Sequence, residues 1–198
     1  ADLVKNYAFQ QAQKGSVDLD ELYAKTWEPF DRNKKWRKEV RQGRLRRPRI
    51  DVFLQHWLSL SLGRDAGSSD LFATFKEMHR ERSVPASDLL ADLAHAAAVF
   101  DRIDAVAEQH PESLAGRFVH RWRAIEASTF TPALLTLFDD GVDDEQRNIG
   151  LAAIESFLVR RLLCQWTTKQ YNLLAIDLAV QLRDCVPAER GVVAQGFL

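Results

Sequence analysis

The chain has 198 residues, of which 46% are hydrophobic and 28% charged, and its formal net charge is -1. This length is enough for one domain or two small ones with a hydrophobic core, and the composition is that of an ordinary globular protein. The near-neutral balance excludes any inference about partners from net charge alone. No apolar run approaches the length of a membrane span, so no membrane partner is expected.

The first residues, ADLVKNYAFQQAQKG, have the pattern of an amphipathic helix rather than that of a signal peptide. Cys164 and Cys185 lie in apolar helical surroundings, which predicts reduced thiols and a cytoplasmic location. The chain begins within a helical pattern without a capping residue and closes on GVVAQGFL without a stop signal. Both ends therefore predict a fragment of a longer, multidomain protein.

Helical spacing of apolar residues dominates the first part of the chain. The first helix is expected to end near Gly15, and Ser16 or Asp18 can cap a second helix. Pro29 is expected to kink or restart that second helix. The later part of the basic stretch RNKKWRKEVRQGRLRRPRI is predicted to be a loop, because it contains Gly43 and Pro48.

After the basic stretch, DVFLQHWLSLSLG predicts a short apolar helix with Asp51 as a possible cap and Gly63 as a stop. A long helix is expected to start at Pro85 or Ser87, and Pro132 is expected in the first turn of a later short helix. The apolar stripe of the long helix comprises Leu89, Leu93, Ala97, Phe100 and Ile103.

These elements add up to about nine helices with no significant sheet. The predicted fold class is all-α, a multi-helix bundle or array, and the predicted organisation is a single helical domain over residues 1–198.

The search for catalytic chemistry finds no motif. Five histidines are spread along the chain, no two of them three or four residues apart, and the sequence has no HExxH, CxxC, phosphate-binding Gly-rich loop or GxSxG elbow. We therefore predict no metal, no cofactor and no catalytic residue. A cluster of carboxylates is expected to form a solvated turn and a helix N-terminus, with a metal-dependent nuclease site as the less favoured alternative. It consists of Asp139, Asp140, Asp143, Asp144 and Glu145.

The basic stretch is the most informative feature, because its many cations are opposed only by Glu39. Lys34, Lys38 and Arg41 are expected to share one helical face. Such a density of cations, with Trp36 among them, can hold a nucleic-acid backbone. The alternative is a solvated face, or cations that pair with acidic neighbours after folding. The candidate nucleic-acid-binding residues are Lys34, Lys35, Arg37, Lys38, Arg41, Arg44, Arg46, Arg47 and Arg49.

Three segments, in order, carry a family resemblance. ADLVKNYAFQ, PRIDVFLQHWLSL and IESFLVRRLLCQWTTKQYNLLAIDLAVQL resemble the helical part of the GmrSD-like restriction proteins, which contain ParB-like and HNH nuclease domains. The resemblance covers the chain from Asp2 to about Leu182. The motif positions are Asp2, Lys5, Asn6, Arg160, Arg161, Lys169 and Asn172, all expected to be structural.

The resemblance also implies what this chain lacks. The DGQQR motif of the ParB-like domain and the HNH domain have no counterpart in this sequence, so none of the family's catalytic residues can be assigned here. The resemblance implies a helical domain that has no catalytic activity of its own. The resemblance implies that the parent protein is an NTP-dependent endonuclease. In that protein the helical domain would pack against the ParB-like domain and contact DNA.

Arg160 and Arg161 are consecutive, so on a helix they diverge by about 100° and cannot share one partner. One is expected at the core edge, with its stem buried and its head bonded to a carboxylate or to loop carbonyls. The other can face solvent, the nuclease domain or DNA. Lys169 and Asn172 are expected to cap and order the following turn.

Two other functions stay open at this point. The first is a helical protein-interaction adaptor whose basic patch recruits an acidic partner. The second is a small enzyme with a pocket near His56, Trp57 and Trp122, which predicts titratable groups with displaced pKa values.

Overall fold

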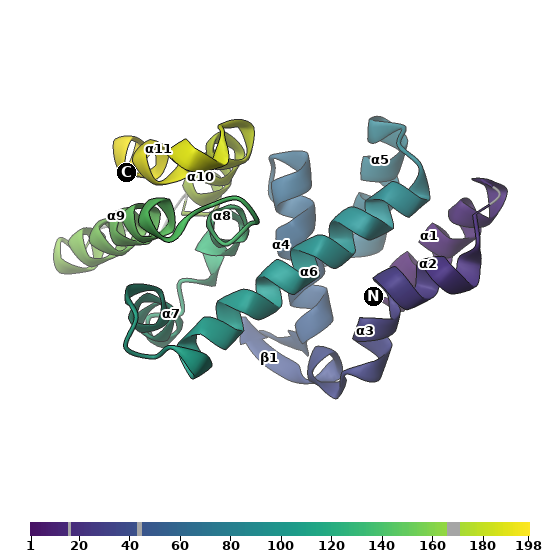
Figure 1. Cartoon of the computed structure of the whole chain (residues 1–198), viewed down its shortest axis with the longest axis horizontal. Helices are drawn as coiled ribbons and strands as arrows, with labels where there is room; N and C mark the ends of the chain where they lie inside the picture. The colour runs from purple at the N-terminus through teal and green to yellow at the C-terminus, as the bar shows by residue number, and fades with distance from the viewer. Residues whose placement is uncertain (16, 43–44, 166–170) are drawn as a thin grey trace. The chain divides into compact units, whose positions relative to one another are not determined.

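The computed structural model describes residues 1–15, 17–42, 45–165 and 171–198 of the chain. This part contains eleven α-helices, four short 3-10 helices and one two-stranded antiparallel sheet (Figure 1). The predicted all-α class is confirmed. The small sheet was not predicted, and the α-helices number eleven rather than about nine because short ones such as α3 (Glu28–Arg32) and α11 (Arg190–Phe197) stand alone.

The backbone divides into two compact units. The first consists of residues 1–62 and 66–98, and the second of residues 63–65 and 99–198. The long helix α6 (Ala86–Gln109) contributes its first half to one unit and its second half to the other. The single domain over residues 1–198 stays a prediction.

The first unit begins with three helices whose ends follow local rules. Asp18 caps α2, since its carboxylate accepts hydrogen bonds from the backbone N–H groups of Asp20 and Glu21. Pro29 lies in the first turn of α3, where its missing N–H is not needed, so the predicted restart is confirmed. The elements are α1 (Asp2–Ala12), η1 (Gln13–Gly15), α2 (Leu19–Thr26), α3 and η2 (Lys34–Arg37).

The rest of the first unit consists of the sheet and two further helices, besides its part of α6. β1 (Glu39–Gln42) pairs with β2 (Leu45–Pro48), and α4 (Arg49–Leu62) and α5 (Leu71–Arg82) follow. Asp51 lies in the first turn of α4 and is not its cap, because β2 runs directly into the helix at Arg49. Gly63 ends α4 with a φ of 65°, as predicted for a left-handed stop.

An aromatic cluster forms part of the core of the first unit. Phe30 lies 5.1 Å from Trp27, 4.9 Å from Trp36 and 6.0 Å from Phe53, measured between ring centroids. All four side chains are at most 2% exposed. Large aromatic rings contribute strongly to core stability, so this cluster fixes η2 against α3 and α4.

The second unit is built from helices around α9 (Asp144–Leu163), which packs along α11 (Figure 1). Gly191 permits this packing, because a Cβ atom there would lie 2.2 Å from the backbone oxygen of Gln146. Pro132 lies in the first turn of α8, as predicted. The other elements are α7 (Leu114–Ala124), η3 (Ser128–Phe130), α8 (Thr131–Leu137), α10 (Tyr171–Asp184) and η4 (Pro187–Glu189).

The predicted stripe on α6 is largely confirmed. Leu89, Leu93, Ala97 and Ile103 are buried, while Phe100 is partly exposed. Among the described residues, no helix combines the length and the apolar character that a membrane crossing requires.

Candidate nucleic-acid interface

The first part of the basic segment does not form the helix that the sequence suggested, and the later part, predicted to be a loop, contains the strand of residues 45–48. Residues 34–37 make a single 3-10 turn, and residues 39–42 and 45–48 form paired strands. Lys34, Lys38 and Arg41 therefore do not share a helical face. The sequence signal for the strand pair is the Gly43–Arg44 dipeptide between two short runs, a pattern typical of hairpins.

Trp36 is a core residue rather than part of the basic surface. Its side chain is 2% exposed, and its ring packs edge-on against Phe30 and, at 5.5 Å, against Phe53. A buried ring cannot stack on a base, so the expected contribution of Trp36 to nucleic-acid binding is wrong. Its role is to anchor the segment, which leaves the neighbouring cations at the surface.

Arg37 and Arg49 have intramolecular partners. Arg37 donates to the carboxylates of Asp2 at 3.0 Å and Asp31 at 3.2 Å. Arg49 is 7% exposed, and its guanidinium carbon lies 4.4 Å from the centroid of the Trp36 ring. Both guanidinium groups hold the basic segment in place.

Arg47 fastens the strand pair to α4. Its Nη1 donates to Oε1 of Gln42 at 2.9 Å and to Oε1 of Gln55 at 2.6 Å, and its Nη2 donates to the Asp51 carbonyl at 3.4 Å. Burial lowers the pKa of Arg47. Burial, and secondarily the charge of Arg47, lowers the pKa of His56 to about 4, so the His56 imidazole is neutral near pH 7.

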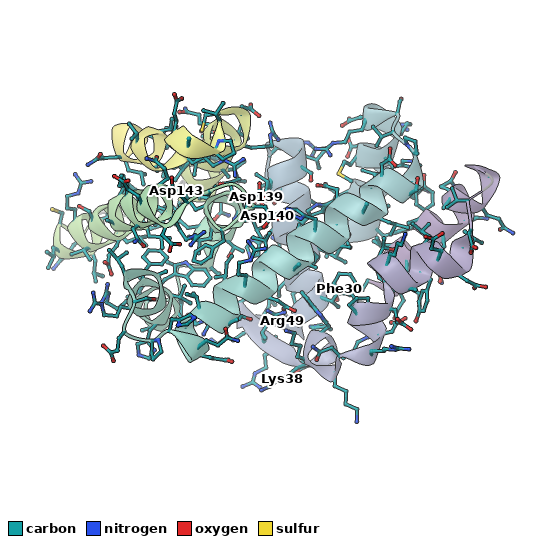
Figure 2. The ribbon with its side chains drawn as sticks, viewed as in Figure 1. Phe30, Lys38, Arg49, Asp139, Asp140 and Asp143 are labelled. Atoms are coloured by element: carbon teal, nitrogen blue, oxygen red, sulfur yellow. The ribbon has the colours of Figure 1, made fainter. Side chains whose placement is uncertain are left out.

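Six candidate cations are exposed: Lys34, Lys35, Arg37, Lys38, Arg41 and Arg46. Figure 2 shows Lys38 at the periphery of the first unit, with Phe30 and Arg49 farther in. Arg44 lies outside the described residues. The structure thus gives Arg37, Arg47 and Arg49 structural contacts within the first unit, and it leaves the side chains of the lysines, Arg41 and Arg46 exposed.

Arg41 and Arg46 are directly opposite each other in the strand register. Directly opposite residues of an antiparallel pair project from the same face, which places two guanidinium stems about 5 Å apart at Cβ. Arg47 lies on the other face and bonds to α4, so the face with Arg41 and Arg46 points away from α4. Glu39 is on this same face, opposite Pro48.

The family-motif positions near the N-terminus are mainly structural. The Lys5 ammonium lies 2.5 Å from the Asp31 carboxylate, and Asp2 binds Arg37, so both motif residues tie α1 to the region that precedes the strands. Asn6 is exposed.

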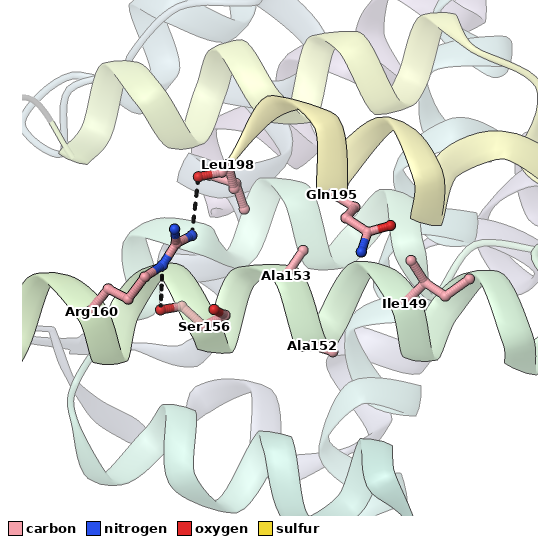
Figure 3. Close-up of a pocket in the computed structure, with 7 residues that line it drawn as sticks. All are labelled: Ile149, Ala152, Ala153, Ser156, Arg160, Gln195 and Leu198. Carbon is pink, nitrogen blue, oxygen red and sulfur yellow. Dashed lines mark hydrogen bonds between the residues drawn. The ribbon is translucent and has the colours of Figure 1, made fainter.

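Arg160 and Arg161 diverge as helix geometry requires. Arg160 donates to the carbonyls of Ser156 and Leu198, each at 3.2 Å, beside a cavity between α9 and α11 (Figure 3). Arg161 lies on a different side, against the rings of Phe157 and Tyr171. One arginine was predicted at the core edge, and that position belongs to Arg161, which is half-buried with a buried Nε atom. Arg160 is exposed.

The last two motif positions are Lys169 and Asn172. Lys169 lies outside the described residues. The Asn172 amide donates to the Asp65 carboxylate at 3.4 Å, which is a long hydrogen bond. Asn172 belongs to the first turn of α10.

The carboxylate cluster between α8 and α9 has structural roles (Figure 2). Asp143 caps α9 by accepting a hydrogen bond from the Gln146 N–H at 2.7 Å. Asp139 pairs with Arg190 at 3.1 Å, and Asp140 pairs with Arg102 at 2.8 Å. The described residues contain no group of three His, Cys, Asp or Glu side chains that could hold a metal ion.

The residues of the alternative enzyme pocket do not gather in one unit. His56 and Trp57 belong to the first unit and Trp122 to the second. The indole N–H of Trp57 donates to Asp92 at 3.1 Å, and that of Trp122 donates to the Ala127 carbonyl at 2.6 Å. These bonds give both tryptophans a structural function.

Comparison with protein-family models, curated proteins and solved structures finds no match for this chain.

Proposed function

We propose that this chain is a helical, non-catalytic domain of a GmrSD-like restriction or phage-defence protein, and that its basic segment contacts the phosphate backbone of DNA. The family part of the proposal rests on the three ordered sequence motifs. In the parent protein the domain would pack against the ParB-like domain. Nucleotide hydrolysis or DNA cleavage by the purified chain would contradict the non-catalytic role.

The observation that carries the DNA contact is the register of the strand pair. Arg41 and Arg46 are directly opposite each other and project from the same face of the strand pair. A phosphate group near both guanidinium groups would accept charge-assisted hydrogen bonds from them. Lys34, Lys35 and Lys38 lie nearby in the chain and are exposed, so they extend the positive surface.

The test is DNA binding by the chain across a salt series, measured by fluorescence anisotropy with a labelled duplex. The test variant replaces four exposed cations by alanine: Lys34→Ala, Lys38→Ala, Arg41→Ala and Arg46→Ala. Each phosphate contact contributes about 0.9 to the steepness of log K against log salt. The slope measured for the variant should therefore be shallower than that of the wild type by about 3 to 4. Its affinity at low salt should fall at least about tenfold.

A matched control removes the same charge elsewhere in the first unit. It carries Lys14→Ala, Lys25→Ala, Lys76→Ala and Arg80→Ala, all at exposed positions. We expect the control to bind DNA like the wild type. Equal losses of DNA affinity in the two variants would mean that binding depends on the net charge of the protein and not on the basic segment. Absence of DNA binding at low salt would instead favour a helical adaptor that binds an acidic protein.

A further inference from the structure

Helix α9 exposes one face along much of its length. The α9 stripe consists of four exposed residues, Ala152, Ser156, Val159 and Leu163. Their spacing of four, three and four positions places the side chains in one row, as in helices that pack along each other. Val159 is 46% exposed and Leu163 is 77% exposed. Large apolar side chains aligned in this way, rather than scattered singly, indicate an interaction surface.

A cavity of about 320 Å³ opens beside the small residues of the α9 stripe (Figure 3). On α9 it is lined by Ala152, Ala153 and Ser156, and on α11 by Gln195 and Leu198. Because side chains this small leave a depression in the helix surface, a large side chain from another helix can enter it. The α9 stripe therefore has a hollow at one end and the projecting Leu163 at the other.

The projecting side chain and the hollow fit each other when two copies of α9 run antiparallel. Leu163 comes eleven positions after Ala152, about 16 Å farther along the helix. A two-fold axis midway between them, close to Val159, brings Leu163 of each copy to the cavity of the other copy. Val159 then meets its own counterpart. A symmetric dimer requires a surface that complements itself in this way, so the feature favours a second copy of the chain over an unrelated partner.

Two charged residues flank the α9 stripe, and both are bonded within the second unit. Arg160 donates to the carbonyls of Ser156 and Leu198, each at 3.2 Å (Figure 3). On the other side, Glu155 accepts from Arg121 of α7 at 2.9 Å. These bonds direct both charged groups away from the stripe. A second helix can thus cover the α9 stripe without burying an unpaired charge.

We propose that a second copy of this chain binds along the α9 stripe, with the two α9 helices antiparallel and Leu163 of each copy in the cavity beside Ala152 of the other. One helix pair buries less than the area of about 800 Å² per partner that is typical of a stable interface, so we expect a weak dimer with a Kd of about 10 to 100 µM. The dimer is independent of the proposed DNA contact, because it uses none of the cations of the basic segment.

The test is sedimentation equilibrium of the complete chain from about 5 to about 500 µM, a range that spans the expected Kd. The average mass should rise from the monomer mass of 22.6 kDa towards twice that value. Leu163→Asp should weaken the dimer at least about tenfold, because a carboxylate would enter the cavity of the other copy. The control is Leu173→Asp on α10 of the same unit, where the side chain is 56% exposed. It should dimerise like the wild type.

A complementary pair of variants tests the antiparallel register. Ala152→Arg alone should also weaken the dimer at least about tenfold, because the long cationic side chain blocks the cavity. In a mixture of Leu163→Asp and Ala152→Arg, the new carboxylate of one copy lies beside the new guanidinium of the other, and the second contact stays as in the wild type. The mixture should therefore dimerise within about tenfold of the wild-type affinity. Both positions are exposed, so the fold should tolerate these changes.

A chain that remains monomeric at about 500 µM would overturn the proposal, since this concentration is well above the expected Kd. The α9 stripe would then be left for another partner, such as the ParB-like domain. Wild-type dimerisation by Leu163→Asp would also overturn it, as would an equal loss in Leu173→Asp. A mixture of the complementary variants that stays monomeric would exclude the antiparallel contact of Leu163 with Ala152.

Discussion

Arg47 on β2 donates a hydrogen bond of 2.6 Å to the side chain of Gln55 on α4, while its neighbour Arg46 projects from the opposite face of the strand pair. Two adjacent arginines of one basic run therefore have different physical roles. One fastens the strands to the core, and the other belongs to the exposed surface that we propose for DNA.

This relationship predicts opposite phenotypes for the two alanine variants. Arg47→Ala should lower the free energy of unfolding by about 1.5 to 3 kcal/mol, because it removes charge-assisted bonds and leaves partly buried acceptors unpaired. Arg46→Ala should leave the urea midpoint unchanged and weaken DNA binding. Urea denaturation followed by circular dichroism measures the first effect, and anisotropy the second. A stable Arg47→Ala variant would contradict the fastening role.

Asp31 joins three elements of the first unit. Its carboxylate accepts from Lys5 at 2.5 Å, from the Tyr23 hydroxyl at 3.0 Å and from Arg37 at 3.2 Å. Although burial alone would raise the pKa of Asp31, the hydrogen bonds from Lys5 and Tyr23 lower it. Asp31→Ala should cost about 1 to 3 kcal/mol of unfolding free energy, since three donors lose their acceptor.

The control for this prediction is Asp20→Ala, in the exposed first turn of α2. Thermal melts of both variants should show a clear fall in Tm for Asp31→Ala and little change for Asp20→Ala. Equal Tm values for the two variants would mean that the Asp31 network adds no stability.

The buried imidazole of His56 predicts a pH-dependent stability. Its pKa is about 4 in the folded protein and 6.5 in the unfolded chain, so the unfolded state binds the additional proton between these values. The stabilisation is complete above pH 6.5 and is lost as the pH falls towards 4. A difference of this size corresponds to at most about 3 kcal/mol.

His56→Leu supplies the comparison, because it removes the titrating group and keeps an apolar side chain at the position. Urea unfolding at intervals from pH 7 to about pH 4 should show a steeper loss for the wild type than for this variant. Parallel curves would show that His56 is not buried as a neutral group. The lowered pKa of Asp31 affects stability only at lower pH, below the ordinary pKa of 3.8 for this group.

Two glycines of α11 should respond in opposite ways to alanine. At Gly191 a Cβ would lie 2.2 Å from the backbone oxygen of Gln146, so Gly191→Ala must push α11 away from α9. We expect a loss of about 1 to 3 kcal/mol, the usual cost of overpacking. At Gly196 nothing lies within 4 Å of the added atom, so Gly196→Ala should be neutral or stabilising by up to about 1 kcal/mol.

Urea denaturation of the two alanine variants beside the wild type checks this contrast. A Gly191→Ala variant as stable as Gly196→Ala would mean that α11 does not pack closely on α9. Because the substitution is the same at both positions, a difference between them reports packing rather than helix propensity.

The sequence by itself determined the features that depend on neighbours a few residues away. Asp18 caps α2, Pro29 and Pro132 lie in first turns, and Gly63 ends α4, each as its local pattern predicted. These signals act through backbone bonds and allowed dihedral angles within one helical turn, so a single sequence contains them. The all-α class follows from the same local periodicity.

Only the tertiary structure decided which charged residues are structural. Arg37 bonds to Asp2, which is 35 positions away, and Arg190 bonds to the carbonyl of Thr136, which is 54 positions away. The strand pair depends likewise on packing against α4, because short strands are set by their surroundings more than by intrinsic propensity. Partners far apart in the sequence leave no local pattern, so a run of similar cations could be divided into core contacts and exposed groups only after the chain had folded.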